Sequence, residues 1–193
     1  MIMSLDIESQ YNQTIEKLKN GLRPLKLYST KEGQLLKDKL DYLADSRPIN
    51  ETELKQVLCL LEHGQCHGID FSQALLKILQ LELSTDVMIF TLSTSIKWVV
   101  EFNQKNGHPI TFNFMNIINA LLLNCSEPEV REWVLRLVDS TGNQSLKFKQ
   151  SLLTIKPLLK PKLFKKTNPH NKNSYKIVLE LEKRWEELLR SFK

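Results

Sequence analysis

A segment of nine residues contains two cysteines and two histidines, namely Cys59, His63, Cys66 and His67. Spacings of four, three and one could place two or three of them on one helix face, where they could bind a soft metal such as zinc. Gly64 is expected to end the helix between them, and no second cysteine or histidine pair lies nearby to complete a tetrahedral site. We therefore expect no metal and no cofactor here, but a buried Cys59 and an ordinary turn.

The chain carries no recognisable catalytic motif. It has no Gly-x-Ser-x-Gly, no phosphate-binding glycine loop and no His-Glu-x-x-His. Trp98, Trp133 and Trp185 each fall on an apolar helix stripe, which favours core packing over a ligand cage. The sequence predicts a noncatalytic protein, and an enzyme that gathers residues from distant segments stays an open alternative.

The distribution of charge departs most from an ordinary chain. Residues 140–179 hold nine lysines and no aspartate or glutamate, although the whole chain carries a net charge of only +5. A cationic face of this kind attracts polyanions or an acidic protein, and salt weakens the attraction. The expected basic face consists of Lys147, Lys149, Lys156, Lys160, Lys162, Lys165, Lys166, Lys172 and Lys176.

Three interpretations of these lysines stay open. They could dock an acidic or helical protein partner, contact nucleic-acid backbones without sequence preference, or only keep a leucine-rich helix soluble. Lysine does not form the bidentate contacts that arginine makes with phosphates and guanine. The aromatic residues of the segment, Phe148, Phe164 and Tyr175, are too few for a base-stacking platform.

Composition indicates one ordinary globular domain. The chain has 193 residues, of which 41% are hydrophobic and 25% charged. Three cysteines are too few for a disulfide scaffold, so free thiols and a cytoplasmic location are expected. The N-terminus lacks a secretory signal, and the longest apolar runs are too short to span a bilayer.

Apolar residues recur at spacings of three and four, which predicts an all-α fold without a sheet. Start signals are the capping box of Ser29 and Glu32, Asn50, Asp70, Thr111, and Ser126 before Pro128. Residues 167–173 read as a polar loop. Helices are expected at about residues 5–22, 29–45, 50–61, 70–79, 84–100, 111–122, 126–138, 146–159, 162–164 and 174–192.

Three apolar stripes begin at Leu54, Val87 and Val130, which lie 33 and 43 residues apart, and each is followed by a second helix. The segment 126–137, Ser-Glu-Pro-Glu-Val-Arg-Glu-Trp-Val-Leu-Arg-Leu, resembles the first helix of a HEAT repeat, so that one good unit covers about residues 126–160. The resemblance to HEAT and armadillo proteins implies a short right-handed stack of helical hairpins over residues 50–160, flanked by N-terminal helices at 1–46 and a C-terminal helix at 174–193. An irregular helical bundle is the alternative, and it would lack the concave surface of a solenoid.

Asp139 follows Trp133, and Asp86 precedes Phe90. Alkylpurine DNA glycosylases, which are HEAT-like and basic and act through an aspartate near tryptophans, are similar in this respect. The chain is short for that family and lacks its arginines.

Together these features predict a noncatalytic adaptor or scaffold, with HEAT-like or bundled helices and a lysine-rich face that docks an acidic or helical partner. If the helices form a solenoid, Lys147, Lys149 and Lys156 should lie near one rim of its concave side. The terminal helices could cap the stack or join another subunit, so the sequence leaves the oligomeric state open.

Overall fold

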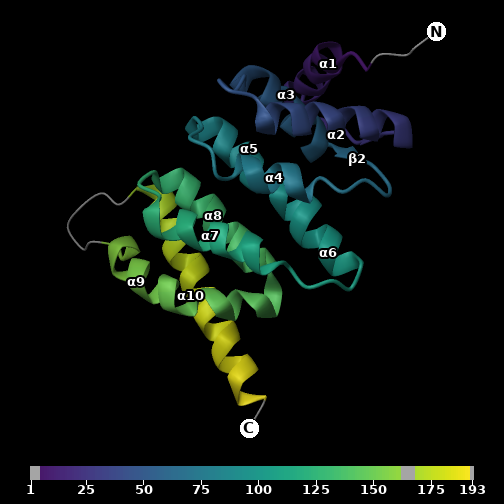
Figure 1. Cartoon of the computed structure of the whole chain (residues 1–193). Helices are drawn as coiled ribbons and strands as arrows, with labels where there is room; N and C mark the ends of the chain where they lie inside the picture. The colour runs from purple at the N-terminus through teal and green to yellow at the C-terminus, as the bar shows by residue number, and fades with distance from the viewer. Residues whose placement is uncertain (1–4, 162–167, 192–193) are drawn as a thin grey trace. The chain divides into compact units, whose positions relative to one another are not determined.

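The computed structural model describes residues 5–161 and 168–191, and this part of the chain is almost entirely helical (Figure 1). The predicted all-α class is confirmed. Contacts divide the chain into two compact units, Met1–Val99 and Val100–Lys193. The predicted repeat segment, residues 50–160, extends through parts of both units, and its assembly as a solenoid stays a prediction. No helix in the described ranges is both long and apolar enough to cross a membrane.

In its described residues, 5–99, the first unit contains five α-helices and one pair of very short strands. A π-helical turn, Ile96–Glu101, continues the last of these helices beyond the unit boundary. The elements of the first unit are α1 (Ile7–Lys19), β1 (Lys26–Leu27), α2 (Thr30–Asp45), α3 (Glu51–Glu62), β2 (Gly64–Gln65), α4 (Ser72–Ile78) and α5 (Thr85–Ser95).

Helix starts in the first unit follow the predicted caps closely. Ser29 and Glu32 form a full capping box at α2, and the Asn50 side chain accepts a hydrogen bond from the backbone N–H of Glu53. Asp70 accepts instead from the N–H of Ser72, at 2.8 Å, so α4 begins later than predicted. The reason is that an aspartate can close a turn two residues ahead instead of capping a helix.

Helix α3 forms the centre of the first unit. Leu54, Val57, Leu58, Leu60 and Leu61 are all buried, and α1, α2 and α5 pack around the helix. The residues from Val57 to Leu61 are all buried, so the second half of α3 is enclosed on every side, whereas Thr52 in its first turn is exposed.

Trp98 joins the core that surrounds α3. The Trp98 ring meets Phe71 edge-on at 4.8 Å, and its indole N–H donates to the carbonyl oxygen of Leu61. Trp98 is buried, which confirms the predicted core role of this tryptophan.

The prediction of no sheet is wrong in one place, because β1 and β2 pair in parallel, with Lys26 opposite Gly64. The ammonium group of Lys97 binds the carbonyl oxygens of Leu61 and Glu62, at 2.9 and 2.8 Å, and also that of Gly64. These contacts satisfy the carbonyl end of α3 and hold the following residues extended. Each strand has only two residues, which is too short to show the alternation of apolar and polar side chains that identifies a strand in a sequence.

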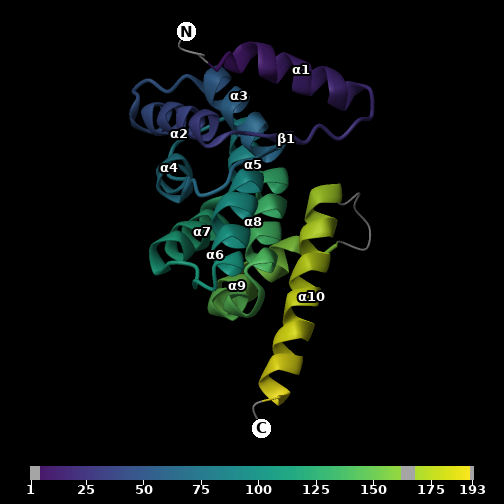
Figure 2. The ribbon, with the colours of Figure 1, turned by 90° about the vertical axis from the view of Figure 1, so that its right-hand side faces the viewer.

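The second unit contains α6 (Phe102–Lys105), α7 (Phe112–Asn124), α8 (Pro128–Ser140), the 3₁₀ helix η2 (Gly142–Phe148), α9 (Lys149–Leu159) and α10 (Pro169–Arg190). Figure 2 shows the length of α10, which packs against α8 and α9. Trp185 is buried as predicted, whereas Trp133 is half-buried, with the Arg136 guanidinium 5.4 Å from its ring centroid.

Three predicted starts in the second unit are wrong. The N-cap of α8 is Glu127, not Ser126, because Pro128 occupies the first helical position and fixes the start one residue later. Residues 142–148 form a 3₁₀ turn, so α9 starts at Lys149 rather than near residue 146. The predicted polar loop is largely helix, because Asn168 caps α10 and Pro169 begins it. The short helix predicted at 162–164 lies outside the described residues.

Replacement of Gly64 by alanine should destabilise the first unit. The new Cβ would collide with the Tyr28 ring and lie 2.6 Å from the carbonyl oxygen of Leu60. We expect Gly64→Ala to lower the free energy of unfolding by about 2 kcal/mol, the usual cost of overpacking. Urea denaturation followed by circular dichroism measures the change. Gln65→Ala, at an exposed position of the same strand, is the control, and an equal effect of the two substitutions would contradict the close packing.

Candidate binding surface

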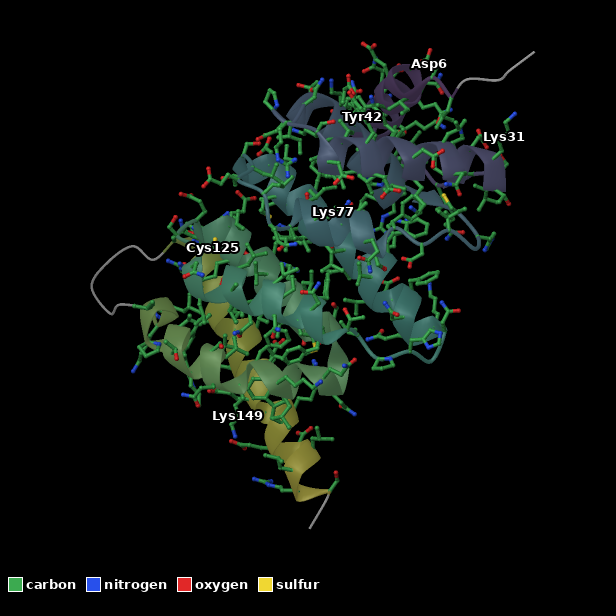
Figure 3. The ribbon with its side chains drawn as sticks, in the orientation of Figure 1. Asp6, Lys31, Tyr42, Lys77, Cys125 and Lys149 are labelled. Carbon is green, nitrogen blue, oxygen red and sulfur yellow. The ribbon has the colours of Figure 1, made fainter. Side chains whose placement is uncertain are left out.

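The lysines of α9 share one stripe of the helix. Phe148, Leu152, Ile155 and Leu159, spaced by four, three and four, are buried. The same spacing one residue later joins Lys149, Leu153, Lys156 and Lys160, and side chains so spaced lie on one helix face. Lys149, labelled in Figure 3, and Lys160 are exposed, and Leu153 is 46% exposed between them.

Lys156 differs from its neighbours because it is paired. Its ammonium group lies 2.6 and 2.8 Å from the two carboxylate oxygens of Glu182 on α10, and both side chains are mostly buried. This pair borders a groove of about 280 Å³ between α9 and α10. The groove is lined by Lys149, Lys156, Glu182, Trp185, Glu186 and Leu189. Acids therefore lie beside the α9 stripe.

Helix α10 presents a second cationic stripe. Its buried side consists of Ser174, Val178, Leu181 and Trp185, again spaced by four, three and four. The outward side carries Lys172, Lys176, Leu179 and Lys183 at the same spacing, all exposed. The sequence analysis missed Lys183 because the acid-free segment ends at Leu179, before Glu180. The helical period, not the absence of acids, identifies this lysine.

Six exposed lysines of η2, α9 and α10 form no ion pair in the part of the chain that the structure describes. Lys105, on α6, differs because it lies 3.9 Å from Glu101. We call the set of six the basic surface, and it consists of Lys147, Lys149, Lys160, Lys172, Lys176 and Lys183. The predicted Lys162, Lys165 and Lys166 lie outside the described residues. The structure thus places Lys149, Lys156 and Lys160 on one stripe, where Glu182 neutralises Lys156. Lys172 and Lys176 lie on the other stripe, and Lys147, on η2, lies on neither.

A buried carboxylate on α8 holds the first turns of α10. Glu132 accepts hydrogen bonds from the Arg136 guanidinium at 2.6 and 3.1 Å, and from the Asn173 amide at 3.3 and 3.4 Å. His170 Nδ1 lies 2.9 Å from the second carboxylate oxygen, which can only accept, so Nδ1 carries the proton. Burial raises the pKa of Glu132, but the bonds from Arg136, His170 and Asn173 outweigh burial and leave the pKa below its ordinary value.

Two further contacts fix the rest of α10. The Trp185 indole N–H donates to the Ser145 hydroxyl at 2.9 Å, which ties α10 to η2. Arg184 forms an ion pair with Asp139 of α8 at 2.8 Å.

Asp86, in the first unit, pairs with Lys55 at 3.1 Å. Both aspartates singled out by the comparison with DNA glycosylases are therefore engaged in ion pairs.

The cysteine and histidine cluster of the first unit has a different character. Cys59 and Cys66 are buried free thiols, and burial raises the pKa of each to about 11. Both thiols are protonated at neutral pH, whereas a metal binds thiolate. Within the described ranges, no three histidine, cysteine or acidic side chains are grouped so that they could hold a metal ion.

No family model, curated protein or solved structure matches this chain. The resemblance of residues 126–160 to a HEAT repeat stays a prediction. The function must therefore be argued from the geometry of the two units.

Replacement of Glu132 by glutamine should loosen α10. The amide nitrogen would face donors, so we expect a loss of about 2 kcal/mol in the free energy of unfolding at neutral pH. Because the folded pKa is lowered, the contribution of Glu132 is complete above its ordinary pKa of 4.5 and declines as the pH falls through the folded value. The stability difference between the wild type and Glu132→Gln should shrink below about pH 4.5.

Urea denaturation at a series of pH values measures this difference. Glu180→Gln, an exposed change on α10, is the control and should leave the stability nearly unchanged. A cost of Glu132→Gln that persisted undiminished at low pH would contradict a charged Glu132 as the anchor.

Proposed function

We propose that this chain is a noncatalytic adaptor whose second unit docks an acidic, helical protein partner along the outward side of α10. The observation that carries the proposal is the uncompensated stripe of Lys172, Lys176 and Lys183 around the exposed Leu179. A cytoplasmic location is part of the proposal, and the three free cysteines support it.

The spacing of the stripe favours a helical partner. From Lys172 to Lys183 the stripe extends about 16 Å at the rise of an α-helix. A helix laid alongside it can present acids at the same intervals of four, three and four residues. Leu179, 42% exposed, and the aliphatic stems of the lysines supply apolar contact beneath the charges.

The anchoring of α10 favours binding without a rearrangement. Contacts through Glu132 hold the first turns of α10, and the contacts of Arg184 and Trp185 hold the helix again about four turns later. A stripe held in one conformation loses less entropy on binding than a flexible lysine-rich tail does.

The magnitude of the interaction follows from the exposure of the lysines. Exposed ion pairs each contribute about 0.5 kcal/mol, and salt weakens them. Three such pairs amount to about a tenfold change in affinity. We therefore expect a complex whose formation is fast and salt-sensitive, because complementary charge raises association rates more than it raises affinity.

The test is affinity purification from the native cell, with and without nuclease, at low and moderate salt. The triple change Lys172→Gln, Lys176→Gln and Lys183→Gln should weaken capture of the partner about tenfold. The matched control changes Lys147, Lys149 and Lys160 to glutamine, which removes the same charge from elsewhere on the basic surface, and it should retain the partner.

Two outcomes would contradict the proposal. Equal weakening by both triple variants would indicate general charge attraction rather than docking on α10. Loss of every partner on nuclease treatment would favour nonspecific nucleic-acid binding through the same lysines.

A further inference from the structure

The segment that follows α1 combines positive charge with exposed leucines. Residues 17–31 contain five lysines and arginines and no aspartate or glutamate. Within this segment Leu22, Leu25 and Leu27 are 59%, 66% and 68% exposed. Single exposed leucines are common, but three within six residues form a small apolar patch that needs an explanation.

Local hydrogen bonds explain how the leucines come to the surface. Helix α1 ends at Lys19, and Gly21 follows with a φ of +73° that suits glycine. The N–H groups of Gly21 and Leu22 donate to the carbonyls of Leu18 and Lys17, both at 3.0 Å. This arrangement closes the helix and turns the chain outward. Pro24 then leads the chain into β1.

The backbone of β1 is satisfied on one side only. The N–H groups of Lys26 and Tyr28 donate to the carbonyls of His63 and Gln65, at 3.1 and 2.9 Å. Because backbone groups alternate along a strand, the N–H and C=O of Leu27 point away from β2. The Tyr28 side chain is buried while the neighbouring Leu27 side chain faces solvent, as the same alternation requires.

The outer edge of β1 can therefore accept another strand. The sheet in the described part of the chain consists of β1 and β2 alone. An unpaired edge is a template for an extended peptide, whose backbone hydrogen bonds give affinity and whose alternate side chains meet the surface. Leu25 and Leu27, two residues apart, lie on one face and could contact such side chains.

The charges identify the class of peptide. Lys19 and Arg23 are exposed beside the edge, whereas Glu32 compensates Lys26 at 3.5 Å. Lys19 and Arg23 are therefore the cations that an approaching segment would meet. A second copy of this chain would bring two such cationic edges together, and the charges would repel. An acidic segment, in contrast, would be attracted to this edge by the same charges.

We propose that the outer edge of β1, together with Leu22, Leu25 and Leu27, is a docking site for an extended segment of another protein in which acidic and apolar residues alternate. The segment adds to β1 as a third strand. This site lies in the first unit and is independent of the stripe on α10, so each can fail without the other.

The first test is nuclear magnetic resonance of the full-length, ¹⁵N-labelled chain. The probe is a synthetic peptide of about eight residues, the length of an ordinary strand, with alternating glutamate and valine. At about 1 mM, the concentration suited to weak binding, the peptide should shift the amide signals of Leu25 and Leu27 and slow hydrogen exchange of the Leu27 N–H. A peptide of alternating lysine and valine should leave these signals unchanged.

A variant then tests the contact directly. Leu27→Glu adds a charge that repels the acidic peptide and should weaken its binding about fivefold. Tyr42→Glu is the matched control, because Tyr42 is 65% exposed in the same unit, on α2 (Figure 3), and it should retain binding. Thermal denaturation of both variants checks that the fold is kept.

Three results would overturn the proposal. The first is an absence of shifts at Leu25 and Leu27 with the acidic peptide. The second is equal binding of the lysine peptide, which would show that charge does not contribute to the affinity. The third is equal weakening by Leu27→Glu and Tyr42→Glu, which would indicate attraction to the whole unit rather than to the β1 edge.

Discussion

The arrangement of the second unit depends on the need to satisfy one buried carboxylate. Glu132 lies inside the contact between α8 and α10, where an unpaired charge would cost several kcal/mol. Its partners come from its own helix, as Arg136, and from the first turns of α10, as His170 and Asn173. These contacts hold the first turns of α10, which begins at Pro169 after the Asn168 cap, against α8. In this orientation Lys172, Lys176 and Lys183 are exposed while Val178 and Trp185 face the core.

Lys97 has a comparable role in the first unit, with the charges reversed. A cation on the π-helical turn satisfies the carbonyl end of α3, so the chain beyond that helix can run extended beside β1. Gly64 then admits the Tyr28 ring, and burial of that ring raises the pKa of its hydroxyl. Because Tyr28 takes the inner face of the strand, Leu27 must take the outer one. The exposed leucines are therefore a consequence of core packing as much as of local sequence.

Several helix starts could be predicted from the sequence because their caps are local. The caps at Ser29, Asn50 and Thr111 depend on side chains three residues from the groups they bind, and all are confirmed. The start of α10 has the same kind of local signal, an asparagine cap before Pro169. It was not predicted because the polar composition of residues 167–173 is typical of a loop. The β1–β2 pair and the Glu132 cluster could not be predicted, because they join residues about 38 positions apart.

The lysines show why a charged segment is not the same as a charged surface. The acid-free run predicted one basic face, yet the helical period distributes most of its described lysines over two stripes, and Glu182, beyond the run, neutralises Lys156. The same period adds Lys183, although the exposed Glu180 and Glu187, three and four residues away, lie beside it on α10. The charge pattern at the surface depends on the angular position of each charge on α10. The anchoring contacts beneath that helix hold those positions, so the pattern of charge on this surface originates in the core.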